Sequence, residues 1–345
     1  MNTILGISAF EDVKSYMPWL EVFVNMEFRA LKAEELEAWL DHVTHVFSGG
    51  RQYFSNHWHN DPWRDPAGIR IAVDNGKIVS TVRVFIRKMF LHGKPVTVGG
   101  IGEVSTRSEY RRRGLATQLL KDAIGFMESR DIVTSSLHGS QRIYSVEGWE
   151  KVPRYYAKQP IAAKKQVAWD VRPANFDDHA EVERIAAIYD AYARKFNGTF
   201  VRDDMDYWTK WVRTESPSAW VAGRDDDIEG YVSVVRDEDK LNVEEFFVSD
   251  PVFAEDRGQQ LFGDLLSNVI AQIDAESLEV TYPAPIADGF NAPTIKEHGS
   301  TMYRINQPDA LPNPSDSIPD MLHNQPESLS QGIKSHHIFW YTDGY

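Results

Sequence analysis

Three successive arginines stand where an apolar, alternating segment gives way to a segment of helical spacing: Arg111, Arg112 and Arg113. The first N–H groups of a helix lack intrahelical partners, and the helix dipole makes that end positive. Guanidinium groups add positive charge and forked donors, while Gly114 and the small Ala116 let a ligand approach the backbone closely. The chemistry that this pattern favours is the binding of a pyrophosphate group.

A second interpretation of the same arginines is a solvated basic turn, neutralised by Glu103, Glu109 and other nearby acids. The chain as a whole carries a net charge of −14, because 51 acidic residues outnumber 37 basic ones. Such a charge disfavours nucleic acid and anionic lipid as partners, and it favours a cationic small molecule. The position of the arginines, after a strand and at the start of a helix, favours the phosphate site over the basic turn.

The composition limits the class of protein further. The chain has 345 residues, enough for two domains, and 42% of them are hydrophobic, as in a globular protein. It contains no cysteine, which excludes disulfides, thiolate metal sites and a catalytic thiol. No apolar segment is long enough to span a membrane, and the first 25 residues make a poor signal peptide. We therefore expect a cytoplasmic protein with no membrane partner.

The elements that must position these residues follow from the spacing of apolar side chains. Residues 69–106 predict three successive strands, with turns at Asn75–Gly76 and at His92–Gly93. Apolar residues at helical spacing then predict a helix from about residue 113 to residue 130. The arginines therefore lie at the junction of the third strand and this helix.

The order of elements occurs a second time. Residues 25–31 predict a strand, residues 31–47 a helix, and residues 56–68 a loop rich in proline and tryptophan. From residue 167, a strand, helix, hairpin, strand and helix follow one another again, which predicts an internal duplication. The expected parts are residues 1–165, residues 166–285, and residues 286–345, an irregular segment whose last strand returns to the first part.

Three short motifs, in this order, resemble those of the GNAT acetyltransferases. The sequence Arg111-x-x-Gly114-x-Ala116 matches the motif with which that family binds the pyrophosphate of acetyl-CoA. Upstream, GGIGEVST resembles the family's fourth strand, whose splayed edge accepts the pantetheine arm. Downstream, IYSVEGWEKV resembles a family element in which a tyrosine, here Tyr144, precedes a glycine, here Gly148, by four residues. The resemblance implies an α/β protein of tandem GNAT folds, each a mixed, mostly antiparallel twisted sheet flanked by helices.

The duplication is similar to that of the enhanced intracellular survival (Eis) acetyltransferases, which carry a second, degenerate GNAT-like unit. This resemblance covers roughly residues 25–282. In the second unit Glu255 stands where a pyrophosphate would need a base, so only the first unit is expected to bind cofactor. Too few residues follow the second unit for the sterol-carrier-like third domain of that family, so we expect none.

By this resemblance the cofactor is acetyl-CoA, and the first unit would supply its binding residues. These are Val104, Ser105, Thr106, Arg111, Arg112, Arg113, Gly114, Leu115 and Ala116. Backbone N–H groups along residues 104–106 would stabilise the oxyanion. Tyr144 would protonate the departing thiolate, because a tyrosine with an ordinary pKa of about 10 keeps its proton at neutral pH.

Two groups are candidates for the base that accepts the proton of the attacking amine. The first is the α-carboxylate of Tyr345, since the terminal carboxylate reaches the active site in Eis-type enzymes and this chain ends in a strand-like aromatic run. The second is Glu103, on the cofactor strand, which can equally be a partner of the arginines. No metal is expected, because His57, His59 and the pair at residues 336–337 lack the spacing and carboxylate partners of a metal site.

The expected function is the transfer of acetyl from acetyl-CoA to a primary amine of a cationic small molecule, such as a polyamine or an aminoglycoside. Direct attack is expected, because the chain has no cysteine to form a covalent intermediate. A protein or peptide lysine is the alternative acceptor, and a non-catalytic acyl-CoA-binding sensor is the alternative class. The sequence leaves the acceptor, the acyl chain length and a homo-oligomer open.

Overall fold

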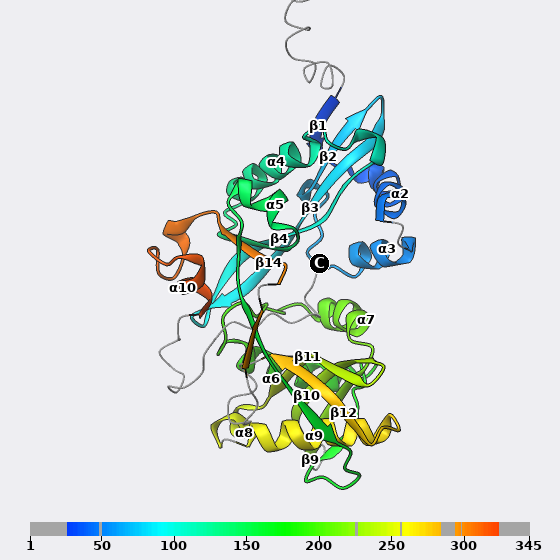
Figure 1. Cartoon of the computed structure of the whole chain (residues 1–345), viewed down its shortest axis with the longest axis vertical. Coiled ribbons are helices and arrows are strands. Elements are labelled where there is room, and N and C mark those ends of the chain that lie inside the picture. The colour runs from blue at the N-terminus through cyan, green and yellow to red at the C-terminus, as the bar shows by residue number, and fades with distance from the viewer. Residues whose placement is uncertain are drawn as a thin grey trace, which may run out of the picture.

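The computed structural model describes residues 26–47, 50–224, 227–255, 257–283, 294–297 and 299–323. Within these residues the strands form two seven-stranded sheets, which follow one another along the long axis of the molecule (Figure 1). Each sheet is mixed, mostly antiparallel and flanked by helices, which confirms the predicted fold class. No helix in this part of the chain is both long and apolar enough to cross a bilayer.

The first sheet has the order β1-β2-β3-β4-β5-β14-β6, in which β4 and β5 are parallel and the other neighbours antiparallel. Its strands are β1 (Met26–Ala30), β2 (Ile69–Asp74), β3 (Lys77–Leu91), β4 (Lys94–Thr106), β5 (Thr134–His138), β6 (Glu150–Lys151) and β14 (Thr301–Ile305). Both predicted turns have two residues of positive φ, with 49° and 77° at Asn75 and Gly76 and 50° and 73° at His92 and Gly93. Such turns match the twist of the flanking strands. The three successive strands are confirmed.

Helices cover both faces of this sheet. They are α2 (Leu36–Phe47), α3 (Arg51–His59), α4 (Leu115–Ser129) and α5 (Gln141–Tyr144), with short 3-10 turns at Ala33–Glu35, Pro66–Gly68, Ser108–Tyr110 and Ser145–Glu147. Successive residues of a strand point to opposite faces. Accordingly, Ile69 and Ile71 of β2 lie in the core that includes α2, whereas Ala72 lies in the core that includes α4.

Helix α3 corrects the prediction of a loop over residues 56–68, because residues 56–59 are helical. The cause is a pair of aromatic residues one turn apart, Phe54 and Trp58, which are buried together against Trp39 of α2. Their spacing suits one face of a helix. The proline and tryptophan residues that follow had masked this signal.

The second sheet repeats the strand order of the first. Its order is β13-β7-β12-β11-β10-β9-β8, so β8 to β12 adjoin as β1 to β5 do, and β11 and β12 are parallel. Its strands are β7 (Arg154–Ala162), β8 (Asp170–Pro173), β9 (Ala219–Arg224), β10 (Asp227–Asp237), β11 (Lys240–Val248), β12 (Ser277–Pro283) and β13 (Thr294–Glu297). Its helices are α6 (His179–Ala193), the π-helix η6 (Tyr207–Val212), α7 (Arg213–Glu215), α8 (Asp250–Ala254) and α9 (Gly258–Gln272). The predicted duplication is confirmed.

The two units exchange strands. β7 follows the first unit in the chain but pairs with β12 and β13 of the second sheet. β14 follows the second unit but pairs with β5 and β6 of the first sheet. After β14, the turn η8 (Pro308–Ala310) and helix α10 (Ile318–His323) pack beside the first sheet, in a core that includes Tyr303 and Leu322. β7 lies before the predicted division at residue 165 but belongs to the second sheet, and β14 lies after the division at residue 285 but belongs to the first. The two divisions stay predictions.

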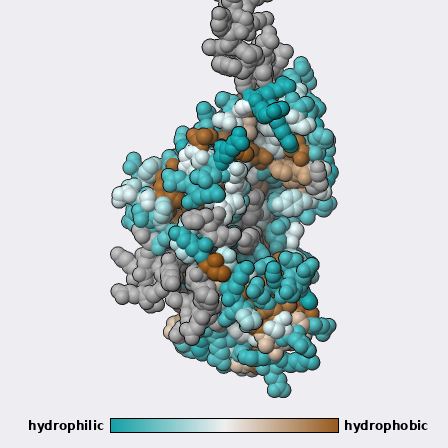
Figure 2. All heavy atoms as spheres, viewed as in Figure 1, coloured by the Kyte–Doolittle hydropathy of each residue, from teal (hydrophilic) through white to brown (hydrophobic). Residues whose placement is uncertain are grey.

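The face of the molecule shown in Figure 2 is mainly polar. Hydrophilic residues dominate the face shown in Figure 2, over both units, and hydrophobic residues appear there in small separate groups. The large aromatic residues are mostly inside, and four of the most deeply buried are tryptophans: Trp39, Trp149, Trp208 and Trp211. Burial of aromatic surface on this scale is a main source of stability.

Candidate active site

Strand β4 carries a bulge at the residues predicted to meet the cofactor. Thr81 of β3 faces Ser105, whereas Arg83 faces Gly102, so β4 holds one more residue than β3 over this interval. Glu103 lies within the bulge and has a φ of 52°. A bulge takes one residue out of the ladder and bends the strand, and bulges are common beside active sites.

β4 and β5 separate next to this bulge. Their parallel pairing runs from Val98 with Thr134 to Ile101 with Leu137 and ends there, while β4 continues to Thr106. The last residues of β4 therefore have β3 on one side and an edge on the other. An unpaired strand edge offers N–H and C=O groups to a ligand. The splayed edge that the motif GGIGEVST implies is present.

The N-terminus of α4 faces outward without a cap. Its N-cap residue is Gly114, with a φ of 78°, and no side chain accepts a hydrogen bond from the first turn. Arg112 also has a positive φ, of 61°. Alternating left-handed residues before a helix curve the backbone into a concave set of N–H groups that suits an anion. The helix begins at Leu115, two residues later than predicted.

The three arginines before this helix are exposed and make few contacts. Arg111 Nε donates to the carbonyl of Thr106 at 3.2 Å, and Arg113 donates to the carbonyl of Glu109 at 2.8 Å. Among the described residues, no carboxylate forms an ion pair with any of the three. The two acids proposed to neutralise them have other partners: Lys77 for Glu109, at 3.6 Å, and Arg83 for Glu103, at 3.5 Å.

Tyr144 ends helix α5, and its side chain is mostly buried. Its ring meets that of Trp149 edge to face at 6.3 Å between centroids, and it packs directly against Gly139. Its hydroxyl forms no hydrogen bond with the residues that the structure describes, so it is available to a ligand. Burial raises the pKa of Tyr144 above its ordinary value, which keeps the phenol protonated at neutral pH.

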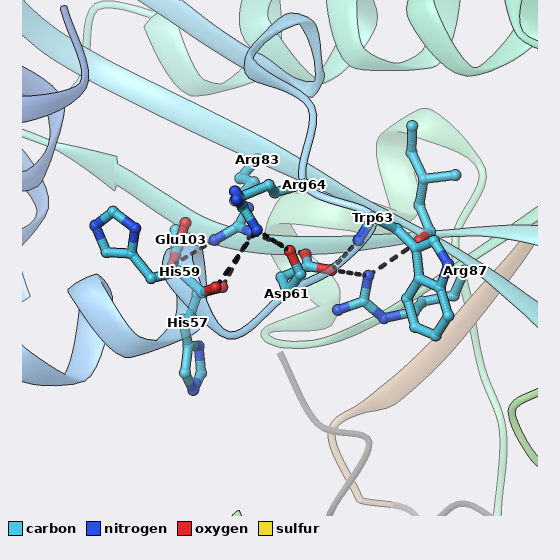
Figure 3. Close-up of polar contacts among 9 residues, drawn as sticks. His57, His59, Asp61, Trp63, Arg64, Arg83, Arg87 and Glu103 are labelled. Carbon is cyan, nitrogen blue, oxygen red and sulfur yellow. Dashed lines mark hydrogen bonds and ion pairs between the residues drawn. The ribbon is translucent and has the colours of Figure 1, made fainter. Parts of the chain in front are cut away.

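Glu103 belongs to a buried network of charges (Figure 3). Asp61 lies between two arginines of β3: it accepts from Arg83 at 3.0 Å and from Arg87 at 2.9 Å. Glu103 Oε1 lies 3.5 Å from Arg83, while its Oε2 is buried without a hydrogen-bond partner among the described residues. Burial raises the pKa of Glu103 above its usual range, although the charge of Arg83 opposes the shift.

Ser105 points away from the splayed edge, into the core beside α2. Its hydroxyl donates to Nε2 of His42 at 3.1 Å, because Nδ1 of His42 donates to the carbonyl of Ile78, also at 3.1 Å. Burial lowers the pKa of His42 to about 4, so the imidazole is neutral. Because its side chain is engaged by His42, Ser105 can contact a cofactor only through its backbone.

The second unit repeats the bulge but not the phosphate site. Ser233 of β10 faces Glu245, whereas Val234 faces Val243, so Glu244 is the extra residue of β11. At the start of α9, Arg257 donates to Glu255 at 2.6 Å. Glu255, the acid predicted to repel a pyrophosphate, thus pairs with Arg257, a basic residue next to this helix end.

Several predicted residues are not brought into one site. His57 and His59 lie on α3, and the described residues contain no group of three or more side chains suited to a metal. Tyr345 and the histidines at residues 336–337 lie outside the described residues. Residues that the sequence reasoning missed are His42, Asp61 and Arg83. A signal existed for Arg83, because this charged residue stands between Val82 and Val84 in the middle of a strand.

Comparisons with known proteins agree with this geometry. A model of the family described as acetyltransferase (GNAT) domain matches residues 27–152. A GCN5-related N-acetyltransferase from Anabaena variabilis is 17% identical, with a TM-score of 0.63 over 82% of this chain and 73% of that one. Eis1 from Mycobacterium abscessus is 16% identical, with a TM-score of 0.55 over 81% and 73%.

A third similar structure is N-myristoyltransferase from Saccharomyces cerevisiae with bound myristoyl-CoA. It is 11% identical, with a TM-score of 0.55 over 82% of this chain and 83% of that one. None of the curated proteins matches the sequence. At these identities the solved structures establish the fold, and the family match establishes the kind of domain. Residues 27–152 thus match the acetyltransferase (GNAT) domain family, and the chain has a tandem GNAT fold.

Proposed function

We propose that the chain transfers an acetyl group from acetyl-CoA to the primary amine of a cationic small molecule, by direct attack of that amine. The proposal rests on the N-terminus of α4, which has no side-chain cap. Beside it lie three arginines that pair with no carboxylate of the described residues. It directly follows a bulged, splayed strand. Backbone N–H groups and guanidinium groups together are the donor set that a pyrophosphate requires.

Two sets of residues would hold the cofactor. The pyrophosphate would lie on Arg111, Arg112, Arg113, Gly114, Leu115 and Ala116, and the pantetheine arm along the backbone of Val104, Ser105 and Thr106. Acetyl-CoA supplies the acetyl thioester that the amine attacks. The N-myristoyltransferase neighbour, whose structure holds an acyl-CoA, supports an acyl-CoA ligand on this fold.

Tyr144 has the properties of the acid. Its hydroxyl is free of hydrogen bonds among the described residues, and burial raises its pKa. A protonated phenol can therefore give its proton to the departing thiolate of CoA. The backbone N–H groups of Val104 and Thr106, at the splayed edge, would stabilise the negative charge that forms on the carbonyl oxygen.

Glu103 and the α-carboxylate of Tyr345 are the two proposed bases. Glu103 is supported by its position in the bulge and by Oε2, which has no partner among the described residues. A carboxyl whose pKa is raised holds a proton more tightly, which makes it a better base near neutral pH. The amine would lose its proton to this base as Tyr144 gives one up, so the products are an amide and CoA.

The acceptor class rests on charge. The chain carries a net charge of −14, which attracts cations and raises their concentration near the surface. We therefore favour polyamines and aminoglycosides, as in an Eis-like enzyme, over a lysine in a protein. A lysine acceptor and a non-catalytic acyl-CoA sensor are the alternatives that the test must separate.

The test is CoA release, followed with a thiol reagent, over a panel of spermidine, kanamycin and a lysine-containing peptide. The chain has no cysteine, so the reagent reports only CoA. Wild type and Tyr144→Phe are compared, and acetyl-CoA binding is measured by calorimetry. We expect turnover on a cationic amine, with kcat lowered at least tenfold in Tyr144→Phe and binding retained. Turnover on the peptide alone would identify a lysine acetyltransferase, binding without any turnover a sensor, and absence of binding would refute the phosphate site.

A further inference from the structure

Helix α3 of the first unit and helix α7 of the second lie side by side (Figure 1). Asn60, which follows α3, donates to the hydroxyl of Thr214 in α7 at 3.1 Å. On the same side, Nε2 of His57 lies 3.6 Å from Oε1 of Glu215. Side chains of both units therefore meet between α3 and α7.

Aromatic rings surround His57 there. The ring of Tyr53 lies 4.1 Å from that of His57, and the ring of Trp211, from the π-helix of the second unit, lies 4.9 Å from it. Tyr53 is 52% exposed and so stands between this place and the solvent. Burial of the remainder of the side chain, and then the negative charges of Glu215 and Glu103, raise the pKa of Tyr53 to about 12. The phenol is thus within electrostatic reach of both carboxylates and keeps its proton.

Two buried polar atoms at this place have no hydrogen-bond partner among the described residues: Oε2 of Glu103 and Nε2 of His57. The side chain of Glu103 is only 5% exposed. A buried carboxylate oxygen without a donor is costly, by more than an average hydrogen bond contributes. A ligand that brings N–H donors would remove this cost.

The charges of the network are also unequal. With Glu103 ionised and His57 neutral, Arg83 and Arg87 supply two positive charges, whereas Asp61, Glu103 and Glu215 supply three negative charges. Asp61 receives the short contacts of both arginines, at 3.0 and 2.9 Å, and Glu103 receives one contact at 3.5 Å. One more positive charge, placed near Glu103 and Glu215, would neutralise the group.

We infer that Glu103, Tyr53 and Glu215 form a subsite for the ammonium form of the reacting amine. Glu215 makes the second unit a part of acceptor recognition. A primary alkylammonium fits because it carries a single charge and three N–H donors. The inference rests on the proposed function, since it places the acceptor beside the proposed base Glu103. It adds that a residue outside the cofactor-binding unit sets the affinity for the acceptor.

The experiment compares wild type, Glu215→Gln and Glu215→Asp with three acceptors: n-butylamine, 1,4-diaminobutane and spermidine. Glu215→Gln keeps the shape of the side chain and removes the charge. We expect KM to rise about tenfold for all three amines, because each presents one ammonium group to the subsite. The expected kcat stays within threefold, Glu215→Asp recovers part of the loss, and the calorimetric Kd for acetyl-CoA is unchanged. Glu183→Gln, an exposed acid on α6, is the matched control and should behave as wild type.

The pattern over the three amines separates a local subsite from the general field of the chain. A field effect grows with substrate charge, so a KM that rises for spermidine but not for n-butylamine overturns the subsite. Equal KM values in wild type and Glu215→Gln overturn it as well, and leave the proposed function standing.

Calorimetric titration of spermidine into the protein, with CoA present, gives a readout that needs no turnover. If wild type turns over no amine but Glu215→Gln weakens spermidine binding about tenfold, the proposed function fails and the subsite stands. If wild type shows neither turnover nor binding, both fail.

Discussion

Replacing Gly139 with alanine should impair catalysis by moving Tyr144 alone. Gly139 follows β5, and its φ is not in the left-handed region, so its backbone accepts an alanine. A Cβ at this position would lie 2.3, 3.0 and 3.2 Å from Cε2, Cδ2 and Cζ of Tyr144. Ordinary contact begins at 3.4 Å, so the added methyl group and the phenol ring cannot both keep their places.

The size of the effect follows from these distances. The ring must move by about 1 Å, the difference between 2.3 Å and ordinary contact. A displacement of this size in a reacting group costs about 100-fold in rate. Tyr144 would still be a tyrosine with a raised pKa, so the loss would come from position. The pyrophosphate site lies on α4 and would be unaffected.

Stopped-flow or steady-state CoA release, with the best acceptor of the panel, measures the change. We expect kcat of Gly139→Ala to fall about 100-fold and the Kd for acetyl-CoA to stay within threefold. Gly125→Ala is the control: this glycine lies in α4 with nothing within 4 Å of an added Cβ. It should keep full activity and gain about 0.5–1 kcal/mol of stability. A Gly139→Ala enzyme as fast as wild type, or equally slowed in a Tyr144→Phe background, would refute the role of Tyr144.

Three further predictions concern binding and stability. Arg111→Gln should raise the calorimetric Kd for acetyl-CoA about fivefold at low salt and less at high salt, since an exposed charge is screened. Burial lowers the pKa of His42 to about 4. As the pH falls, the unfolded chain therefore protonates this imidazole at a higher pH than the folded chain does. The free energy of unfolding, measured in urea, should thus keep its highest value above pH ~6.5 and decrease as the pH falls toward 4. The decrease should be less steep in His42→Gln. Arg202→Leu should cost about 3–5 kcal/mol by removing the cation that pairs with the buried Glu245, and the double variant Arg202→Leu/Glu245→Leu should recover most of it in thermal unfolding.

The elements that the sequence predicted well depend on local patterns. The strands β2 to β4 have turn residues, Asn75–Gly76 and His92–Gly93, whose positive φ values belong to two-residue hairpins. Helix α4 has apolar residues on one face at helical spacing, and they are the residues that are buried. Each of these signals lies within about fifteen residues of chain, so one sequence suffices to read it.

Strand β14 has no such signal. Its five residues, Thr301–Ile305, stand among proline, asparagine and serine, and the strand exists because β5 and β6 lie on either side of it. Those partners lie about 150 to 170 residues earlier in the chain. Tertiary pairing of this kind overrides local composition, so residues 286–332, which include β14, were predicted as irregular.

The same distinction applies to the candidate site. The arginine motif and Tyr144 lie in short motifs that can be recognised without a structure. The environment of Glu103 cannot, because Asp61, Arg83 and Glu215 come from three separate segments that only the fold brings together. Its burial, its partly paired carboxylate and its raised pKa are therefore properties of the tertiary structure.

The exchange of β7 and β14 bears on how the chain can be synthesised and divided. During translation, β5 and β6 emerge well before the strand that must lie between them, so the first sheet keeps an open seam until residue 305 leaves the ribosome. An open seam is an aggregation hazard that a chaperone would cover. A gene cut between the two units would give two products, each carrying a strand that completes the other. Such halves should stay insoluble apart and become soluble when they are produced in the same cell.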